Sequence, residues 1–83
     1  MYKIYFNKQS RKALLKTPRD VSEAMRKKLN EIALDPFKQR SDVEPLKGRQ
    51  GYRLKSGKWR AIYTIEKEEL NILVIKIASR GDV

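Results

Sequence analysis

The strongest structural signal in the chain is Gly51-Tyr52-Arg53-Leu54-Lys55-Ser56-Gly57-Lys58-Trp59-Arg60-Ala61-Ile62-Tyr63-Thr64-Ile65. Apolar and polar side chains alternate in it on both sides of a Ser-Gly pair. Alternation with a period of two is typical of a strand that buries one face, and a Ser-Gly pair between two such runs indicates a turn. The segment therefore predicts a β-hairpin with strands over 51–55 and 58–65.

A third strand extends this hairpin toward the C-terminus. Residues 66–69 are polar and predict a second turn, and residues 70–78 form the most apolar run of the chain, with a length suited to a strand. Strands that follow one another through short turns pair in antiparallel fashion. The second half of the chain is thus expected to form a three-stranded antiparallel meander.

One strand and two helices are predicted before the meander. Residues 2–6 mix β-branched and aromatic side chains in alternation, which favours a strand. A short helix is expected from Lys8 or Ser10 to Lys16, and a second helix begins at Thr17, a good N-cap residue, with Pro18 in the first helical position. The inward side of the second helix is expected to carry apolar residues at helical spacing, namely Val21, Ala24, Met25, Leu29, Ile32 and Ala33.

The second helix ends at Asp35-Pro36, and residues 35–50 are polar and rich in turn-forming residues, so they are interpreted as a loop. The predicted fold class is α+β: an N-terminal strand, a two-helix hairpin and a three-stranded meander. These elements would form one mostly antiparallel sheet packed on the helices. At 83 residues the chain is expected to be a single domain over 1–83.

Charge points to the class of partner. The chain has 20 Lys and Arg against 10 Asp and Glu, a net charge of +10. Such an excess repels itself unless a polyanion is bound, so nucleic acid is the leading candidate. Solubility and binding to anionic membranes are the alternatives for a basic surface, and an acidic protein partner is compatible with it as well.

The residue inventory narrows the chemistry. The chain has no cysteine and no histidine, which excludes thiol nucleophiles, histidine-based triads and structural zinc sites. Catalysis would have to use Lys, Arg, Tyr, Asp or Glu. No apolar run reaches the length of a signal peptide or a membrane span, so a cytoplasmic protein is expected. Neither a metal nor a cofactor is expected.

The parity of strand residues sorts the cations by face. Arg53 and Lys55 alternate with the apolar residues of the first hairpin strand, and Arg60 alternates with those of the second. On the last strand, Leu73, Ile75 and Ile77 are expected to form the core set, with Lys76 and Arg80 on the opposite side. One assignment of faces then gathers several cations on the side away from the helices: Arg53, Lys55, Lys58, Arg60, Lys76 and Arg80.

A sheet face that simply meets water would mix acids with bases, yet the strands over 52–55 and 58–65 contain no acid. Arginine offers a bidentate fork to phosphate and lysine a compact charge, so a polyphosphate backbone is the natural ligand of this face. RNA is therefore the expected ligand. Further candidate RNA contacts are Lys47, Arg49, Lys58 and Lys76.

These same residues resemble a known family. Residues 51–55, then Gly57-Lys58-Trp59-Arg60-Ala61-Ile62-Tyr63, then Ile77-Ala78-Ser79-Arg80-Gly81-Asp82-Val83 are similar to the C-terminal half of RelE-type toxins, in the RelE/ParE superfamily. The preceding strand and helix pair match the order of elements in that family. The resemblance implies a RelE-like microbial RNase fold and the toxin of a type II toxin-antitoxin pair, which enters the ribosomal A site and cuts mRNA there.

The resemblance also implies site residues and partners. The positions that match the family's catalytic residues are Arg53, Lys55, Arg60 and Arg80. The implied partners are an acidic, RelB-like antitoxin, the ribosome and mRNA. RNA cleavage by attack of a 2′-hydroxyl needs a base, an acid and cations, but no metal. Lys55, crowded by like charges, is a candidate base, and Arg60 and Arg80 suit phosphate binding.

Two alternatives remain open. RelE-type chains commonly carry a tyrosine directly after the segment that corresponds to 80–83, and this sequence stops before it. Either the natural protein is longer, or this version has lost the group and would be an RNA-binding or ribosome-binding module with weakened or abolished cleavage. The related ParE branch shares the fold but poisons DNA gyrase and lacks the cationic set. The combination of Arg53, Lys55, Arg60 and Arg80 favours the RelE branch.

Overall fold

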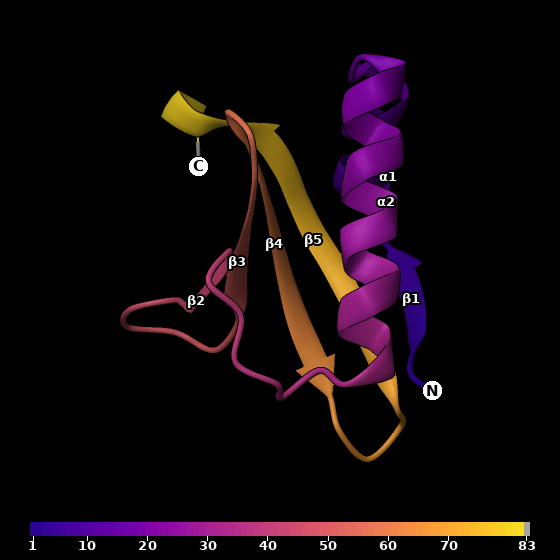
Figure 1. The fold of residues 1–83 in the computed structure, drawn as a ribbon, viewed down its shortest axis with the longest axis vertical. Coiled ribbons are helices and arrows are strands. Elements are labelled where there is room, and N and C mark those ends of the chain that lie inside the picture. The colour runs from indigo at the N-terminus through magenta and orange to yellow at the C-terminus, as the bar shows by residue number, and fades with distance from the viewer. Residues whose placement is uncertain (83) are drawn as a thin grey trace.

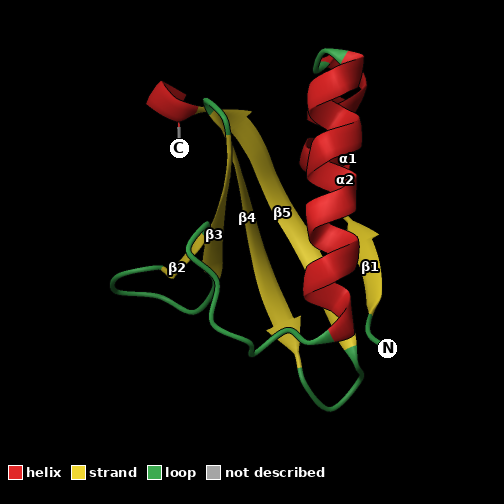
Figure 2. Ribbon diagram, in the orientation of Figure 1, coloured by secondary structure: helices red, strands yellow, loops and turns green. Residues whose placement is uncertain are grey.

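The computed structural model describes residues 1–82, except for the side chain of Asp82 (Figures 1 and 2). A strand and two helices come first, then four strands and a final turn of 3-10 helix. They are β1 (Lys3–Phe6), α1 (Lys8–Lys16), α2 (Arg19–Leu34), β2 (Val43–Pro45), β3 (Tyr52–Ser56), β4 (Trp59–Glu66), β5 (Asn71–Ser79) and η1 (Arg80–Asp82).

All of the strands join one sheet. Its order is β1-β5-β4-β3-β2, so the C-terminal strand β5 lies between β1 and β4. β1 pairs with β5 in parallel, and the other pairs are antiparallel. Both helices lie on the same side of the sheet (Figure 1), which leaves the other side without a covering layer. The α+β class, the helix pair and the antiparallel meander are confirmed.

The core lies between α2 and the sheet. Met25, Leu29 and Ile32 point from α2 toward the strands, and each is almost completely buried. The strands contribute Leu54, Ala61, Tyr63, Ile72, Val74 and Ile77. This inner side of the sheet holds the apolar residues of β3 and β4 at the predicted parity, because burial of apolar surface is the main favourable term in folding. Burial raises the pKa of the Tyr63 phenol to about 12.

The junction between the helices differs from the expectation. Thr17 does not cap α2: it ends α1, where its hydroxyl donates a hydrogen bond of 2.7 Å to the carbonyl of Ala13. Pro18 takes the N-cap position of α2, without a side-chain cap bond. Ala24 is exposed rather than inward, because it lies at the rim of the apolar stripe of α2.

The region predicted as a loop contains a short strand. Within 35–50, β2 pairs with β3, with Val43 opposite Leu54 and Pro45 opposite Tyr52. Proline lacks a backbone donor and is tolerated in a sheet only where no donor is needed, as on an edge strand. β2 therefore extends the sheet by one edge strand, which places Glu44 opposite Arg53.

A bulge in β5 overturns part of the predicted apolar set. Tyr63 pairs with Val74 while the preceding residue, Ile62, pairs with Lys76, so Ile75 has no counterpart on β4. Ile77 is buried as expected. Leu73 and Ile75 are not on its side: the buried residues before the bulge are Ile72 and Val74, because the extra residue reverses the parity of the strand.

The loop and first turn of α1 hold the bulge in place. The side-chain amide of Asn7 donates to the carbonyl of Ile75 (2.9 Å), and the buried hydroxyl of Ser10 donates to that of Val74 (2.8 Å). Gln9 accepts a bond from the backbone N–H of Ile77 at 3.3 Å. Backbone groups that the ladder leaves unpaired at the bulge are thereby satisfied.

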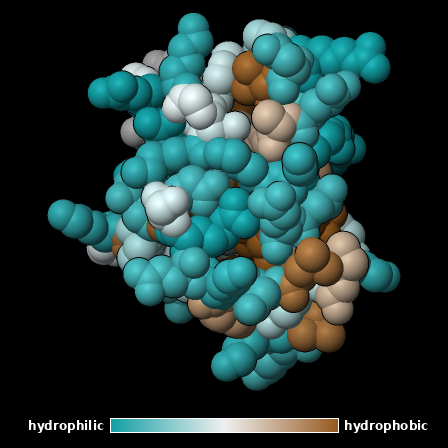
Figure 3. Space-filling model, viewed as in Figure 1, coloured by the Kyte–Doolittle hydropathy of each residue, from teal (hydrophilic) through white to brown (hydrophobic). Residues whose placement is uncertain are grey.

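None of the helices within residues 1–82 has the length and apolar character needed to cross a bilayer. The surface on the side drawn in Figure 3 is mostly hydrophilic, with apolar atoms gathered at the lower right, over the C-terminal end of α2.

Candidate nucleic-acid interface

The uncovered side of the sheet, here called the outer face, carries cations in two neighbouring cross-strand rows. In one row Lys55 of β3 stands opposite Arg60 of β4. In the next row Arg53 and Lys76 flank Ile62. The sequence predicted that these four cations share a face, and the pairing of the strands brings them together. We call Arg53, Lys55, Arg60 and Lys76 the cationic face.

An apolar residue forms the floor between these charges. Ile62 points to the outer face, yet only 2% of its surface is exposed. Its neighbours in the row are Arg53 and Lys76, whose aliphatic stems can cover apolar surface while their charged ends reach water. Charges above an apolar floor act in a lower dielectric than bulk water, so they attract an anion more strongly.

Arg60 is held at the hairpin turn. Its Nη1 donates hydrogen bonds to the carbonyls of Gly57 (2.8 Å) and Trp59 (2.9 Å). Two bonds from one nitrogen set the position of the guanidinium plane. The opposite edge of the guanidinium forms no hydrogen bond with any residue of the described part of the chain, which suits a group that binds two phosphate oxygens.

Lys55 is positioned through its backbone. Its N–H donates to the carbonyl of Asp42 at 2.8 Å, and its carbonyl accepts a bond of 3.1 Å from the ammonium of Lys28 on α2. The strand that carries Lys55 is thus tied to both the β2 edge and the helix layer. Its side chain is half-buried on the outer face.

A network of ion pairs supports that strand. Arg40 donates to both oxygens of Asp42, at 2.9 and 3.0 Å, and its third nitrogen lies 3.2 Å from Glu31. Lys28 lies 3.4 Å from the same Asp42 carboxylate. Chiefly because Arg40 donates to it, the pKa of Asp42 falls from 3.8 to about 2, and the pKa of Arg40 rises.

Glu44 is a site residue that the sequence interpretation missed. Its carboxylate lies 3.0 Å from Nη1 of Arg53, and both side chains are partly exposed. Within residues 1–82 it is the only acid in the two cationic rows. A three-residue strand that contains a proline has no periodic signal, so the sequence places Glu44 in a loop and not opposite Arg53.

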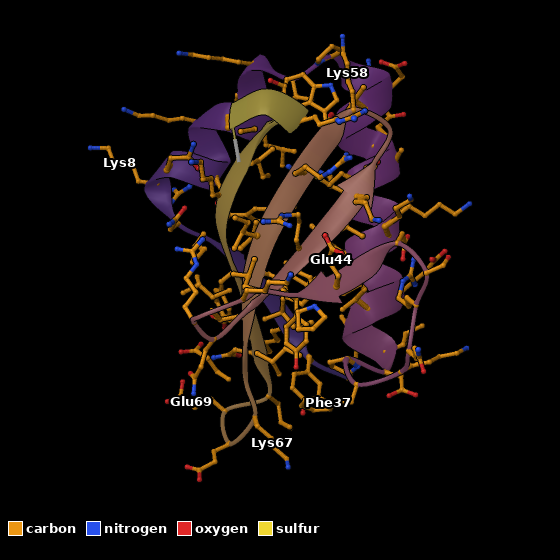
Figure 4. All side chains as sticks on the ribbon, turned by 90° about the vertical axis from the view of Figure 1, so that its left-hand side faces the viewer. Lys8, Phe37, Glu44, Lys58, Lys67 and Glu69 are labelled. Carbon is orange, nitrogen blue, oxygen red and sulfur yellow. The ribbon has the colours of Figure 1, made fainter. Side chains whose placement is uncertain are left out.

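The remaining predicted residues lie around the cationic face. Lys47 and Arg49, in the loop between β2 and β3, line a hollow of about 400 Å³ together with Glu44 and Arg53. Lys58 lies at the tip of the β3–β4 turn, at the upper end of the face (Figure 4). The carbonyl of Lys58 accepts a 2.6 Å bond from the N–H of Arg80, so both residues share that end of the sheet.

Arg80 follows β5 directly and is exposed. The predicted candidates therefore fall into three places: the cationic face, the Lys58 and Arg80 end, and the Lys47 and Arg49 loop. Val83, after which the resemblance expects a tyrosine, lies outside the described residues. Within 1–82, no three His, Cys, Asp or Glu residues gather in a way that could hold a metal ion.

Comparisons with known proteins agree with this architecture. A chain of the archaeal RelE-RelB complex from Pyrococcus horikoshii OT3 is 26% identical, with a TM-score of 0.83 over 99% of this chain and 98% of that one. A chain of the E. coli RelBE toxin-antitoxin complex is 24% identical, with a TM-score of 0.78 over 95% and 96%. The YoeB/ParE toxin from Agrobacterium tumefaciens is 18% identical, with a TM-score of 0.78 over 93% and 96%.

Curated protein sequences contain no significant match. Residues 4–83, nearly the whole chain, match the family described as "ParE toxin of type II toxin-antitoxin system, parDE". The chain therefore belongs to the RelE/ParE superfamily, as a toxin of a type II toxin-antitoxin system.

Proposed function

We propose that this toxin is a ribosome-dependent endoribonuclease that cuts mRNA in the ribosomal A site without a metal ion. The observation that carries the proposal is the pair of cross-strand rows that gather Arg53, Lys55, Arg60 and Lys76 beside one carboxylate, Glu44. Four cations on one uncovered face match the charge of an RNA backbone, and the carboxylate adds a proton acceptor.

The chemistry is transesterification. The 2′-oxygen attacks the neighbouring phosphorus and loses its proton to a base, and the bond from phosphorus to the 5′-oxygen breaks as that oxygen gains a proton. The products are a 2′,3′-cyclic phosphate and a 5′-hydroxyl. Negative charge builds up on the phosphoryl oxygens in the transition state, where the oriented fork of Arg60 would stabilise it. The ribosome would hold the codon of the mRNA in a reactive geometry.

Two groups on the face are candidate bases. Lys55 is the one that the sequence suggests, and it must be neutral to accept a proton. Glu44 is the one that the structure adds, and an ionised carboxylate accepts a proton directly. The variant Lys55→Arg separates the roles, because arginine keeps the charge but does not act as a base at neutral pH.

The test is cleavage of mRNA on programmed ribosomes, mapped by primer extension, with the wild-type chain, K55R, K55A and E44Q. If Glu44 is the base, E44Q loses about 10²-fold to 10⁴-fold in cleavage rate while K55R stays active. If Lys55 is the base, K55R is as inactive as K55A. Lys8→Ala, an exposed cation of α1 away from the face, is the matched control. Intact ribosome binding by a wild-type chain that never cuts would contradict the proposal.

The family match supports a second candidate, inhibition of DNA gyrase, because the matching family is named for ParE. A supercoiling assay with purified gyrase, run beside the ribosome assay, separates the two functions. Crosslinking to ribosomal RNA without cleavage would instead indicate a binding module. A variant with a tyrosine added after Val83 tests whether a tyrosine at that position raises the rate of cleavage.

An antitoxin is the proposed regulatory partner, since several similar structures are toxin-antitoxin complexes. A groove of about 670 Å³ runs between the N-terminal segment 1–6 and α2, where Arg26, Leu29 and Asn30 line it. Its walls are largely apolar, and β1 beside it is an edge strand. Apolar side chains of an acidic partner would lie along this groove and the helices, with its acids near Arg53, Lys55 and Arg60.

A further inference from the structure

A second hollow lies at the end of the sheet away from Lys58 (Figure 4), and no predicted site residue belongs to it. Its volume is about 390 Å³, and its lining residues come from the loop after α2, from β2 to β3 and from the β4–β5 turn. They include Phe37, Pro45, Gln50, Gly51, Tyr52 and Lys67. This size is in the range of small-ligand pockets.

Aromatic rings with an adjacent cation form two of its walls. Phe37 is 56% exposed, which is unusual for a phenylalanine, and Nζ of Lys67 lies 5.7 Å from the centre of its ring. The ring of Tyr52 is stacked on Tyr63, with centroids 5.5 Å apart and planes 23° apart. Stacking on the buried Tyr63 fixes the orientation of the Tyr52 ring. The hollow therefore has one rigid aromatic wall, Tyr52, and one solvent-exposed aromatic ring, Phe37.

Gly51 is a lining residue whose backbone conformation requires glycine. Its φ of 129° is one that residues with a side chain rarely adopt. An added Cβ would lie 3.0 Å from Cδ1 of Leu46 and 3.2 Å from the carbonyl oxygen of Tyr63. Glycine therefore lets the chain pass close to Leu46 and β4 where it borders the hollow.

The hollow adjoins the basic loop hollow at the β2 edge of the sheet, where Tyr52 points to the helix side and Arg53 to the outer face. Pro45 lines both this hollow and the neighbouring one, which Lys47, Arg49 and Arg53 line. Gly51 precedes Arg53 by two residues, about 7 Å along an extended strand. None of the lining residues of the aromatic hollow is acidic. A chain of phosphates bound by the cations would therefore carry its bases past this point.

We propose that the Phe37 hollow is a stacking subsite for a nucleobase of single-stranded RNA, an inference that rests on the proposed nuclease function. Every base has a π-face, so an exposed aromatic ring beside cations binds a base of any identity. Nζ of Lys67 lies over one face of the ring, so the base stacks on the other face and Lys67 attracts the phosphate of the stacked nucleotide. The subsite sets where the strand is held relative to Arg53 and does not take part in bond breaking.

The test compares two probes: a short, fluorescently labelled 2′-O-methyl oligoadenylate, which has no 2′-hydroxyl to react, and an abasic oligomer of the same length and charge. Binding is measured by anisotropy for the wild type, F37A, F37W and the control L15A, which removes an exposed apolar residue of α1. F37A is expected to weaken oligoadenylate binding about 5-fold to 100-fold, and F37W to restore it. Binding of the abasic oligomer is expected to be the same for all four proteins.

Equal losses for both probes in F37A, or none for either, would overturn the proposal. So would an F37A chain that keeps its oligoadenylate affinity but loses affinity for the antitoxin, because the surface would then be a protein contact. Circular dichroism of each variant shows that the fold is retained. Cleavage on programmed ribosomes is measured separately: a base-specific loss in F37A from a chain that never cuts would refute the nuclease function and leave the subsite standing.

Discussion

Arg60 combines two roles in one side chain, since the same guanidinium organises a turn and belongs to the cationic face. Replacing Arg60 by Ala is expected to abolish toxicity and to lower cleavage about 10²-fold to 10³-fold, the usual effect of removing one donor that stabilises a transition state. Loss of the bonds to Gly57 and Trp59 is expected to cost about 1 kcal/mol of stability. Growth arrest, primer extension and urea melts measure the three quantities.

R60K is the matched control for this substitution. It keeps one charge but cannot bind two phosphate oxygens as a fork, so its cleavage rate is expected to lie between those of the wild type and R60A. An R60A chain that remains folded and still arrests growth and cuts mRNA like its parent would remove Arg60 from the site.

The bonds of Asp42 with Arg40 make the free energy of unfolding depend on pH. Its pKa is about 2 in the folded chain against 3.8 for the free carboxyl, so folding favours the ionised form. This contribution is complete above about pH 4 and is lost as the pH falls from 4 toward 2, because protonation of Asp42 breaks its bonds with Arg40. Its size is about 1 to 2 kcal/mol.

Urea melts of the wild type and Asp42→Asn at a series of pH values test this assignment. D42N is expected to be less stable near pH 7 and to lose less stability on acidification from pH 4 to pH 2. Parallel pH curves for the two proteins would show that another carboxyl accounts for the acid sensitivity.

At the scale of elements, Asn7 joins a helix to the bulge of β5. Its side-chain oxygen accepts the N–H of Ser10, which caps α1, and its amide donates to Ile75. N7A loses both bonds and is expected to lower the free energy of unfolding by about 1 to 2 kcal/mol. N7D keeps the cap acceptor and loses only the donor, so thermal melts should place it between the wild type and N7A. Equal melting temperatures for all three would contradict the role of Asn7.

The limits of sequence interpretation follow from these contacts. β4 was predictable because its own residues alternate, and so were Arg53, Lys55 and Arg60 as neighbours, since parity within one hairpin sets their face. The bulge in β5 was not predictable, because Asn7 and Ser10, which hold it in place, lie more than 60 residues away in the chain. Lys76 reached its predicted face, although Leu73 and Ile75 did not join the core.

The candidate site, like the fold, was predictable only in part. Cations on regular strands were assigned to the outer face by local pattern alone. Glu44 and Phe37 were not predicted as site residues. The face of Glu44 depends on the pairing of the three-residue edge strand β2, and the exposure of Phe37 depends on the path of the loop after α2. Residues whose position depends on tertiary pairing carry no periodic signal of their own.

For the whole molecule, the net charge of +10 predicts salt-sensitive binding. Each phosphate neutralised by Lys or Arg releases counterions, so the affinity for ribosomes is expected to fall steeply as salt rises. Titrations at several salt concentrations measure the slope, and K76M is expected to reduce it by about one. An affinity that hardly varies between low and high ionic strength would exclude phosphate contacts as the main source of binding.

The antitoxin is expected to stabilise the whole toxin. A partner that binds only the folded state raises the free energy of unfolding by about 2.7 kcal/mol at a concentration 100 times its Kd. Melting the toxin alone and with the product of the neighbouring gene measures this shift, and Arg26→Glu, in the groove along α2, is expected to reduce it for an acidic partner. No shift, together with full activity in the mixture, would count against this partner.

The order of the strands determines when the sheet can close during synthesis. β5 lies inside the sheet, between β1 and β4, but is the last of the described strands along the chain, and Lys3 of β1 pairs with Asn71 across most of the described sequence. A nascent chain that has not yet emerged through β5 has no partner for β1, and β4 has only β3 on one side. The sheet therefore closes only after residues 71–79 have been synthesised, so a shorter nascent chain has neither a paired β1 nor the complete cationic face, which includes Lys76 of β5.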